Sequence, residues 1–303
     1  MEWTETIKRT IDYLEQHMLE QINVAELGKV TAVSPFYLQK GFALMTGVTI
    51  GEYIRNRRLY LAALDLIMRD EKVIDVAYHY GYESPESFTR AFTRFHQVSP
   101  AAIKKEPSRI NSYLPLKISI SILGGNAMDY VVEKMNAFKV VGFKKSIPFE
   151  HGYEKIPEFW EEFLETYMQG RGPKENQEVV NNCMIGEYGV SINNPEDVTY
   201  FDYLIAGMYD ESKLTKDMVA RLNEKVSEDM VIKEIPAMEW ARFRCVGPLS
   251  GNLQSLNTRI YTDWLPNNKE YDITGDVTLE WYSCGDTTSS DYISEIWIPV
   301  KRK

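Results

Sequence analysis

A nine-residue pattern that occurs twice limits the fold of this chain more than any other feature of its sequence. The two copies are SPFYLQKGF at 34–42 and SPESFTRAF at 84–92. Serine is a favoured N-cap residue, and proline suits the first helical position because the amide there has no intrahelical partner. Each copy therefore predicts the start of a helix, and the repeat predicts two copies of one helical unit.

Each predicted helix follows a shorter helical segment and a tight turn. These segments are VAELGKVTAV at 24–33 and VIDVAYHYGYE at 73–83. Apolar residues at helical spacing give each capped helix a face for packing. They are Leu38 and Phe42 in the first copy, and Phe88, Phe92 and Phe95 in the second. A helix, a turn and a capped second helix form the helix-turn-helix arrangement.

The opposite face differs between the copies. It carries Phe36, Gln39 and Lys40 in the first copy and Glu86, Thr89 and Arg90 in the second, at the same spacing. In the major groove, Gln pairs with adenine, Arg or Lys with guanine, and Phe contacts the thymine methyl group. Matched packing residues with altered groove residues predict two readers of different DNA sequences. The alternative is a pair of ordinary bundle helices with solvated polar faces, which two copies with the same cap make less favourable.

A long helix is predicted between the copies, at residues 50–70. At 1.5 Å per residue it is about 30 Å long, and major-groove faces on one side of B-DNA are about 34 Å apart. One chain is thus predicted to read two half-sites one turn apart. Arg55, Arg57 and Arg58 on this helix are candidate phosphate contacts, or alternatively a solvated charge cluster.

Residues 5–106 resemble the AraC/XylS family of transcription regulators. The most specific match is VIDVAYHYGYESPESFTRAFTRFHQVSPAAIKK, starting at Val73. The resemblance implies base-reading positions at Phe36, Gln39 and Lys40, and at Pro85, Glu86 and Arg90. Family members often have a long polar side chain in place of Glu86, and Pro85 has no side-chain hydrogen-bonding group. Related regulators mostly activate by contacting RNA polymerase, so the resemblance implies an activator with promoter DNA and RNA polymerase as partners.

The net charge of −10 does not exclude DNA binding, because it is unevenly distributed. Residues 1–110 hold 14 cationic and 14 anionic residues, and the rest of the chain holds 20 and 30. The scattered Cys183, Cys245 and Cys284 and the four histidines predict neither a metal site nor a cofactor. The polar start MEWTETIKRT and the short apolar runs predict neither a signal peptide nor a membrane span. We therefore expect a cytoplasmic protein with reduced thiols.

The sequence pattern changes from helical to strand-rich after a segment rich in proline, serine and glycine. We expect an all-α DNA-binding domain at 1–108, a linker at 109–128 and an α+β domain at 129–303. The last domain contains its own repeat, because VVEKMNAFKVVGFK at 131 aligns with VIKEIPAMEWARFR at 231. Each is followed by an aromatic-rich helix and two strands. A β-α-β-β unit used twice predicts one antiparallel sheet with helices on one side and a groove between the halves.

This second half resembles the GyrI-like (gyrase-inhibitor-like) effector-binding domains of multidrug-sensing regulators, most clearly in the strands TLEWY and EIWIPV. Such domains bind small amphipathic, often cationic, molecules between aromatic walls, with a glutamate as countercharge. The resemblance makes Glu280 the candidate carboxylate. Tyr282 shares its face of the strand, and Glu187 is the candidate in the first repeat. Candidate wall residues are Trp160, Phe163, Tyr167, Tyr261 and Trp264.

Alternatives remain open for this half. The aromatic residues taken singly favour a core role, and Glu280 has Arg242 or Arg244 as a candidate structural partner. The leading interpretation is a ligand-controlled transcription regulator that is not an enzyme and has no catalytic residues. The alternatives are a small-molecule hydrolase with Glu280 as general base, and a DNA-binding protein whose second domain is a ligand-independent protein-interaction module.

Overall fold

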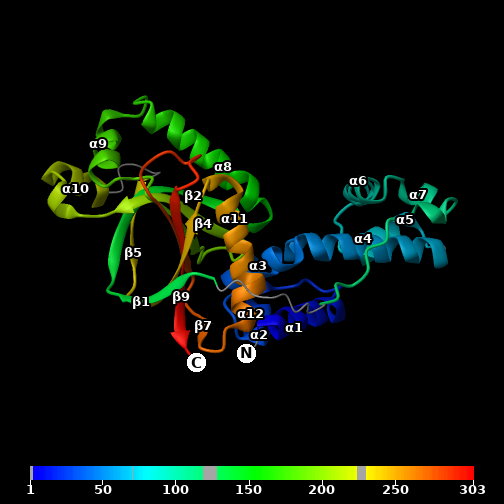
Figure 1. The fold of residues 1–303 in the computed structure, drawn as a ribbon. Coiled ribbons are helices and arrows are strands. Elements are labelled where there is room, and N and C mark those ends of the chain that lie inside the picture. The colour runs from blue at the N-terminus through cyan, green and yellow to red at the C-terminus, as the bar shows by residue number, and fades with distance from the viewer. Residues whose placement is uncertain (1–2, 70, 119–127, 224–229) are drawn as a thin grey trace. The chain divides into compact units, whose positions relative to one another are not determined.

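The computed structural model describes residues 3–69, 71–118, 128–223 and 230–303 (Figure 1). The chain divides into two compact units. The first holds residues 1–33 and 46–122, and the second holds residues 34–45 and 123–303. Residues 119–127 of the predicted linker lie outside the described residues.

The first unit is helical. Its helices are α1 (Trp3–Gln16), α2 (Val24–Thr31), α4 (Ile50–Met68), α5 (Val73–His79), α6 (Pro85–His96), α7 (Pro100–Ile103) and the 3₁₀ turn η1 (Pro107–Arg109). Thr49 and Glu52 form a reciprocal capping box at the start of α4. The predicted long helix is thereby confirmed, from Ile50 to Met68.

The second helix-turn-helix follows the predicted pattern. The Ser84 hydroxyl accepts a hydrogen bond from the Ser87 amide, and Pro85 occupies the first turn of α6. Gly81, in the turn before α6, has a φ of 80°, which favours glycine. Phe88 and Phe92 are buried against residues of α4 and α5, including Leu59. The apolar face of this helix was therefore predicted correctly.

The second unit is built on one antiparallel sheet. Within the described ranges its strands are β1 (Tyr130–Met135), β2 (Phe138–Pro148), β3 (Tyr188–Asn193), β4 (Tyr200–Met208), β5 (Met230–Ile235), β6 (Met238–Val246), β7 (Tyr271–Ile273), β8 (Val277–Tyr282) and β9 (Ile293–Arg302). The order is β1-β6-β9-β8-β3-β4-β2-β5, with β7 added beside β9. The predicted α+β fold from a repeated β-α-β-β unit is confirmed.

The two repeats exchange their first strands. β1 of the first repeat pairs with β6 of the second, and β5 of the second repeat pairs with β2 of the first. The repeats meet at the centre of the sheet, where β3 pairs with β8. Each repeat therefore completes the sheet of the other, whereas the sequence indicated only two successive strands joined by a turn.

The helices of this unit are α3 (Pro35–Thr46), α8 (Gly152–Phe163), α9 (Lys174–Asn182), α10 (Lys216–Asn223), α11 (Leu249–Arg259) and α12 (Leu265–Asn267). The π-helical segments η3 (Leu164–Met168) and η5 (Ile260–Trp264) extend α8 and α11, and η2 (Phe149–His151) and η4 (Glu211–Lys213) are 3₁₀ turns. Helices α8 and α11 lie beside the strands in Figure 1. Side chains alternate along β8, so Leu279 enters an apolar core while Glu280 and Tyr282 face the helices. No helix among the described residues is long and apolar enough to cross a membrane.

Candidate functional site

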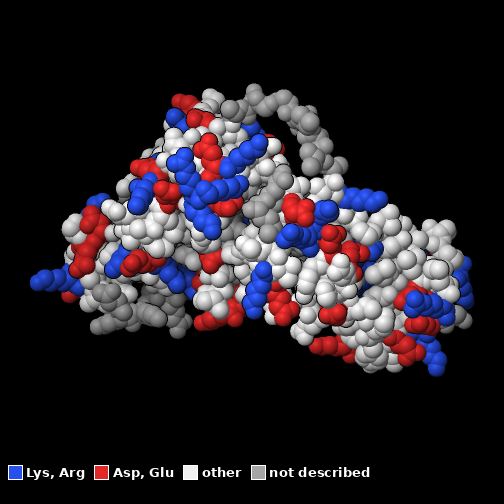
Figure 2. Space-filling model, turned by 90° about the horizontal axis from the view of Figure 1, so that it is seen from below, with Lys and Arg blue, Asp and Glu red and all other residues white. Residues whose placement is uncertain are grey.

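The outer face of α6 is exposed. Glu86 and Arg90 are exposed, and Pro85 and Thr89 are partly exposed, while Phe88 on the opposite face is fully buried. Acidic and basic side chains are interspersed on the face of the molecule drawn in Figure 2. The prediction that these four residues contact DNA remains a prediction, and their exposure is compatible with it.

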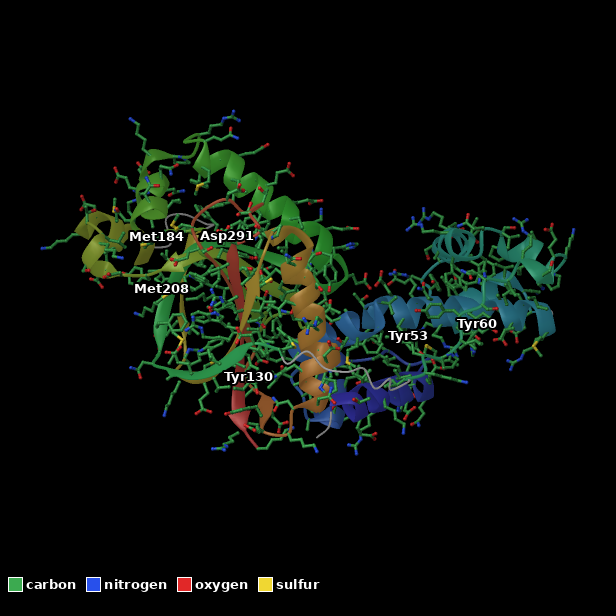
Figure 3. All side chains as sticks on the ribbon, in the orientation of Figure 1. Tyr53, Tyr60, Tyr130, Met184, Met208 and Asp291 are labelled. Atoms are coloured by element: carbon green, nitrogen blue, oxygen red, sulfur yellow. The ribbon has the colours of Figure 1, made fainter. Side chains whose placement is uncertain are left out.

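The arginines of α4 have different environments. Arg55 is exposed. The Arg57 guanidinium is buried, lies 2.7 Å from a Glu15 carboxylate oxygen and donates to the Tyr113 carbonyl at 2.6 Å. Burial alone would lower the Arg57 pKa, but the hydrogen bonds that Arg57 donates to Glu15 outweigh burial and raise it. Tyr53, labelled on α4 in Figure 3, donates to the same carboxylate at 2.7 Å.

The interpretation of Arg57 as a phosphate contact is therefore corrected. Its guanidinium is enclosed by partners within the helical unit, so it acts as a structural ion pair. Arg58 is partly exposed and donates to the backbone carbonyls of Met18 and Glu20, at 2.7 and 2.6 Å. These bonds hold the segment after α1. The prediction of phosphate contacts therefore now concerns Arg55 and Arg58.

The second unit contains a cavity of about 510 Å³ on the helix-bearing face of the sheet. Strands β3, β4 and β8 form its floor, helices α8 and α11 form two walls, and α3 forms a third. The lining includes Ser191, Phe201, Glu280 and Tyr282 from the strands, Tyr153, Ile156, Pro157 and Trp160 from α8, and Leu249, Leu253, Gln254 and Asn257 from α11. A volume of this size accommodates a drug-sized organic molecule.

A hydrogen-bond network holds the Glu280 carboxylate at the cavity floor. Tyr282 donates to Glu280 Oε2 at 2.7 Å, and Tyr203 donates to the same oxygen at 3.1 Å. The Trp160 indole donates in turn to the Tyr203 hydroxyl at 2.9 Å. Burial and the nearby carboxylate raise the pKa of both tyrosines well above the ordinary value, so both hydroxyls remain protonated donors.

Room for this network depends on a glycine. Gly189 of β3 lies opposite Glu280 of β8 in the strand register. A Cβ atom on Gly189 would lie 2.3 Å from the Tyr203 hydroxyl and 2.9 Å from Glu280 Oε2. Any larger residue would therefore displace the carboxylate or its tyrosine donor.

The α3 wall contains residues that were predicted to read DNA. Phe36 and Lys40 line the cavity together with Ala43 and Leu44. Phe36 is 1% exposed and lies edge-on to Phe149, with ring centroids 5.9 Å apart. Gln39 is 8% exposed and donates to the Val198 carbonyl at 2.6 Å. The expectation of an exposed reading face on α3 is therefore wrong for this structure, because an aromatic side chain and a polar anchor bury that face in the second unit.

The other predicted ligand residues lie in different places. Glu280, Tyr282 and Trp160 line the cavity, but the remaining candidates lie outside its lining. Phe163 and Tyr167 pack on Phe143, and Trp264 packs on Phe243. Tyr261 is fully buried. Phe163, Tyr261 and Trp264 thus belong to the core, as the alternative interpretation held for each aromatic residue, and Tyr167 is partly buried against it.

The first-repeat glutamate also lies outside the cavity lining. Glu187 precedes β3, and its carboxylate accepts a hydrogen bond from the Trp281 indole at 3.0 Å. Arg242, one of the candidate structural partners of Glu280, is instead bonded to Glu133 and Glu295. Glu280 is therefore held by tyrosines in the cavity. Contacts of Glu280 and of the other predicted residues with a ligand remain predictions.

Sequence reasoning missed Tyr203, Gly189 and the α3 side of the cavity. Their proximity to Glu280 follows from strand order and helix docking, which no signal within their own segments could predict. Within the described ranges, His, Cys, Asp and Glu do not gather in groups of three that could hold a metal ion.

Comparison with known proteins shows the family. A family model described as a GyrI-like small molecule binding domain matches residues 128–301, more than half of the chain. The chain belongs to the GyrI-like family. A helix-turn-helix domain model matches residues 27–106, which makes this an AraC-type helix-turn-helix joined to a GyrI-like domain.

Two curated relatives are similar in sequence to part of this chain. The HTH-type transcriptional regulator YbfP of Bacillus subtilis is 31% identical over 156 residues, covering 48% of this chain and 53% of YbfP. The regulatory protein SoxS of Salmonella typhimurium is 35% identical over 101 residues, covering 33% of this chain and 94% of SoxS. The alignment thus spans about half the length of YbfP.

The GyrI-like part is similar to a solved structure of SAV2435 bound to tetraphenylphosphonium. The sequence identity is 18%, the TM-score is 0.44, and the alignment covers 57% of this chain and 94% of that one.

Proposed function

We propose that this protein is a one-component transcription regulator in which the AraC-type domain binds promoter DNA and the GyrI-like domain binds a small amphipathic cation. The observation that carries the proposal is the Glu280 carboxylate, held by Tyr203 and Tyr282 at the floor of an aromatic-walled cavity. The same chain presents an exposed helix face on α6. We further propose a cytoplasmic activator that contacts RNA polymerase.

The chemistry of the cavity favours a cation with apolar groups. A carboxylate attracts positive charge, and the aromatic side chains of Phe149 and Trp160, which also line the cavity, can attract a cation through their electron-rich ring faces. The described hydrogen bonds to Glu280 both end on Oε2. Among the described residues Oε1 accepts no further hydrogen bond, so this oxygen is the one available to a ligand. Apolar side chains around it accommodate the rest of an amphipathic molecule.

Exchange of Glu280 for glutamine tests the cavity. Glu280→Gln keeps the shape of the side chain and removes its charge, so we expect roughly tenfold weaker binding of tetraphenylphosphonium. Binding of tetraphenylborate, an anion of the same shape, should be unchanged or stronger. Titration calorimetry measures both affinities. Glu187→Gln is the matched control, since that carboxylate lies outside the cavity lining and should leave both affinities unchanged. Equal losses for both ions in Glu280→Gln would remove this carboxylate from cation recognition.

Exchange of Arg90 for alanine tests the DNA side. Arg90 is exposed on α6, and we expect Arg90→Ala to weaken binding by about 1–3 kcal/mol while relaxing specificity at one base step. Selection of bound duplexes from a random-sequence pool, followed by titration of the enriched site, measures both effects. A uniform loss of affinity on every sequence would assign Arg90 to a phosphate instead of a base.

A further inference from the structure

The helix α3 belongs by sequence to the helix-turn-helix match and by packing to the effector-binding unit. We infer that α3 and a cationic effector compete for one cavity, so that binding of the effector releases α3 from its docking site and makes it available to DNA. This inference rests on the proposed function and specifies how that cavity is regulated. It follows from three features of the docked helix.

The first feature is that the N-terminal part of α3 is anchored by three contacts. The Tyr37 hydroxyl donates to the Val277 carbonyl of β8, and the Gln39 amide donates to the Val198 carbonyl. Phe36 inserts beside Phe149, which itself packs on Phe201 with ring centroids 5.0 Å apart. A buried hydrogen bond, a partly buried one and a buried aromatic ring define a specific docking site for this part of the helix.

The second feature is the position of a cation. Lys40 projects from α3 into the cavity lining, where Glu280 also lies. Its ammonium group is 6.0 Å from the Phe36 ring centroid. Burial lowers the Lys40 pKa, and the attraction of Glu280 opposes that shift. When protonated, Lys40 offers the same chemistry as the proposed effector, a positive charge beside aromatic carbon in the cavity that Glu280 also lines.

The third feature is mutual exclusion. The side chains of Phe36 and Gln39 are buried in this arrangement, so they are not available to base edges in a major groove. DNA reading by α3 therefore requires the helix to leave its site. An effector that takes the place of Lys40 and Phe36 removes part of what holds the helix, because a ligand shifts an equilibrium by its difference in affinity for the two states.

The test is a selection of bound duplexes from a random-sequence pool with the full-length protein. Without additive, we expect a single half-site motif, read by α6 alone. With tetraphenylphosphonium, we expect a second motif about 10 base pairs away, because α3 then reaches the adjacent groove face. Tetraphenylborate should leave the single motif, since it carries the wrong charge for Glu280.

A variant separates docking from ligand binding. Tyr37→Phe removes the anchor to β8 without touching the positions predicted to read DNA. We expect the two-part motif to appear without additive, about threefold to tenfold more often than in the wild-type protein. Hydrogen exchange of residues 35–46 should be faster to a similar degree. Tyr292→Phe is the matched control, because that buried tyrosine also donates to a backbone carbonyl, of Ser283, and should keep the single motif.

The outcomes distinguish this inference from the function on which it rests. A two-part motif from the wild-type protein without additive would overturn the inference, as would a single motif when calorimetry shows tetraphenylphosphonium bound. Both results would leave a DNA-binding, ligand-binding protein intact. Absence of any enriched motif, or of any tetraphenylphosphonium binding, would instead overturn the proposed function and the inference with it. A two-part motif in the tetraphenylphosphonium and Tyr37→Phe samples supports it.

Discussion

Replacing Arg57 with alanine should lower the free energy of unfolding of the helical unit by about 3–5 kcal/mol. The guanidinium is the buried partner of Glu15, and it also donates to the Tyr113 carbonyl. Its loss leaves a partly buried carboxylate and a carbonyl without their main donor. Hydrogen exchange of the α1 and α4 amides in the full-length protein, measured against denaturant, gives the local free energy.

Arg69→Ala is the matched control for this prediction. Arg69 lies on the same segment and faces Asp65 at 3.4 Å, but its side chain is 65% exposed. A surface pair of this kind contributes between 0 and about 1 kcal/mol. If Arg57→Ala lowered the free energy of unfolding no more than Arg69→Ala does, the pair with Glu15 would not stabilise the unit. Arg57 would then again be a candidate phosphate contact.

The same pair predicts a pH dependence. Burial alone would raise the Glu15 pKa, but hydrogen bonds from Arg57 and Tyr53 outweigh it, and the pKa lies below its ordinary value of 4.5. The contribution of the pair is therefore present above pH 4.5 and is lost as the pH falls through the lowered pKa. In Arg57→Ala this loss on the acid side should shrink.

Gly189→Val should have the other large effect, with the free energy of unfolding of the sheet lowered by about 3 kcal/mol. The first added carbon already lies 2.3 Å from the Tyr203 hydroxyl, and the two further methyl groups need additional space. Because Glu280 Oε2 is also within 2.9 Å, the carboxylate must move. We expect tetraphenylphosphonium affinity to fall roughly 100-fold, which corresponds to about 2.7 kcal/mol.

Gly152→Ala is the control at the same cavity. A Cβ atom on Gly152 meets the Phe201 ring at 3.5 Å, which is ordinary van der Waals contact. Stability and ligand affinity should therefore stay near the wild-type values in calorimetry of both processes. Wild-type affinity in Gly189→Val would show that Tyr203 and the carboxylate move aside without cost, which would contradict the network described above.

Local signals predicted the helical unit well. Ser84, Pro85 and the spacing of Phe88 and Phe92 act within one helix, so α6 and its exposed face could be derived from neighbouring residues alone. The repeated β-α-β-β pattern likewise predicted the antiparallel sheet, because alternation and turns are local properties.

The remaining features depend on contacts between distant residues. Nothing near Arg57 in the sequence distinguishes it from Arg55, since its partner Glu15 lies on another helix. The position of the Glu280 carboxylate depends on Gly189 and Tyr203, which strand pairing brings next to it. Phe36 and Lys40 have the spacing of a groove-reading face, but that same mixture of aromatic ring and cation also suits a cavity with a carboxylate. Residue types alone therefore could not distinguish a DNA-reading face from the lining of a cavity.

The exchange of β1 and β5 means that the two repeated segments of this domain depend on each other. Neither repeated segment contains all the hydrogen-bonding partners of its own strands, because the outermost strand of each one pairs with a strand of the other. Deleting either segment would leave the outer strand of the other without its hydrogen-bonding partner, so neither segment can form the complete sheet alone. A single segment would need a second copy of itself to close the same sheet.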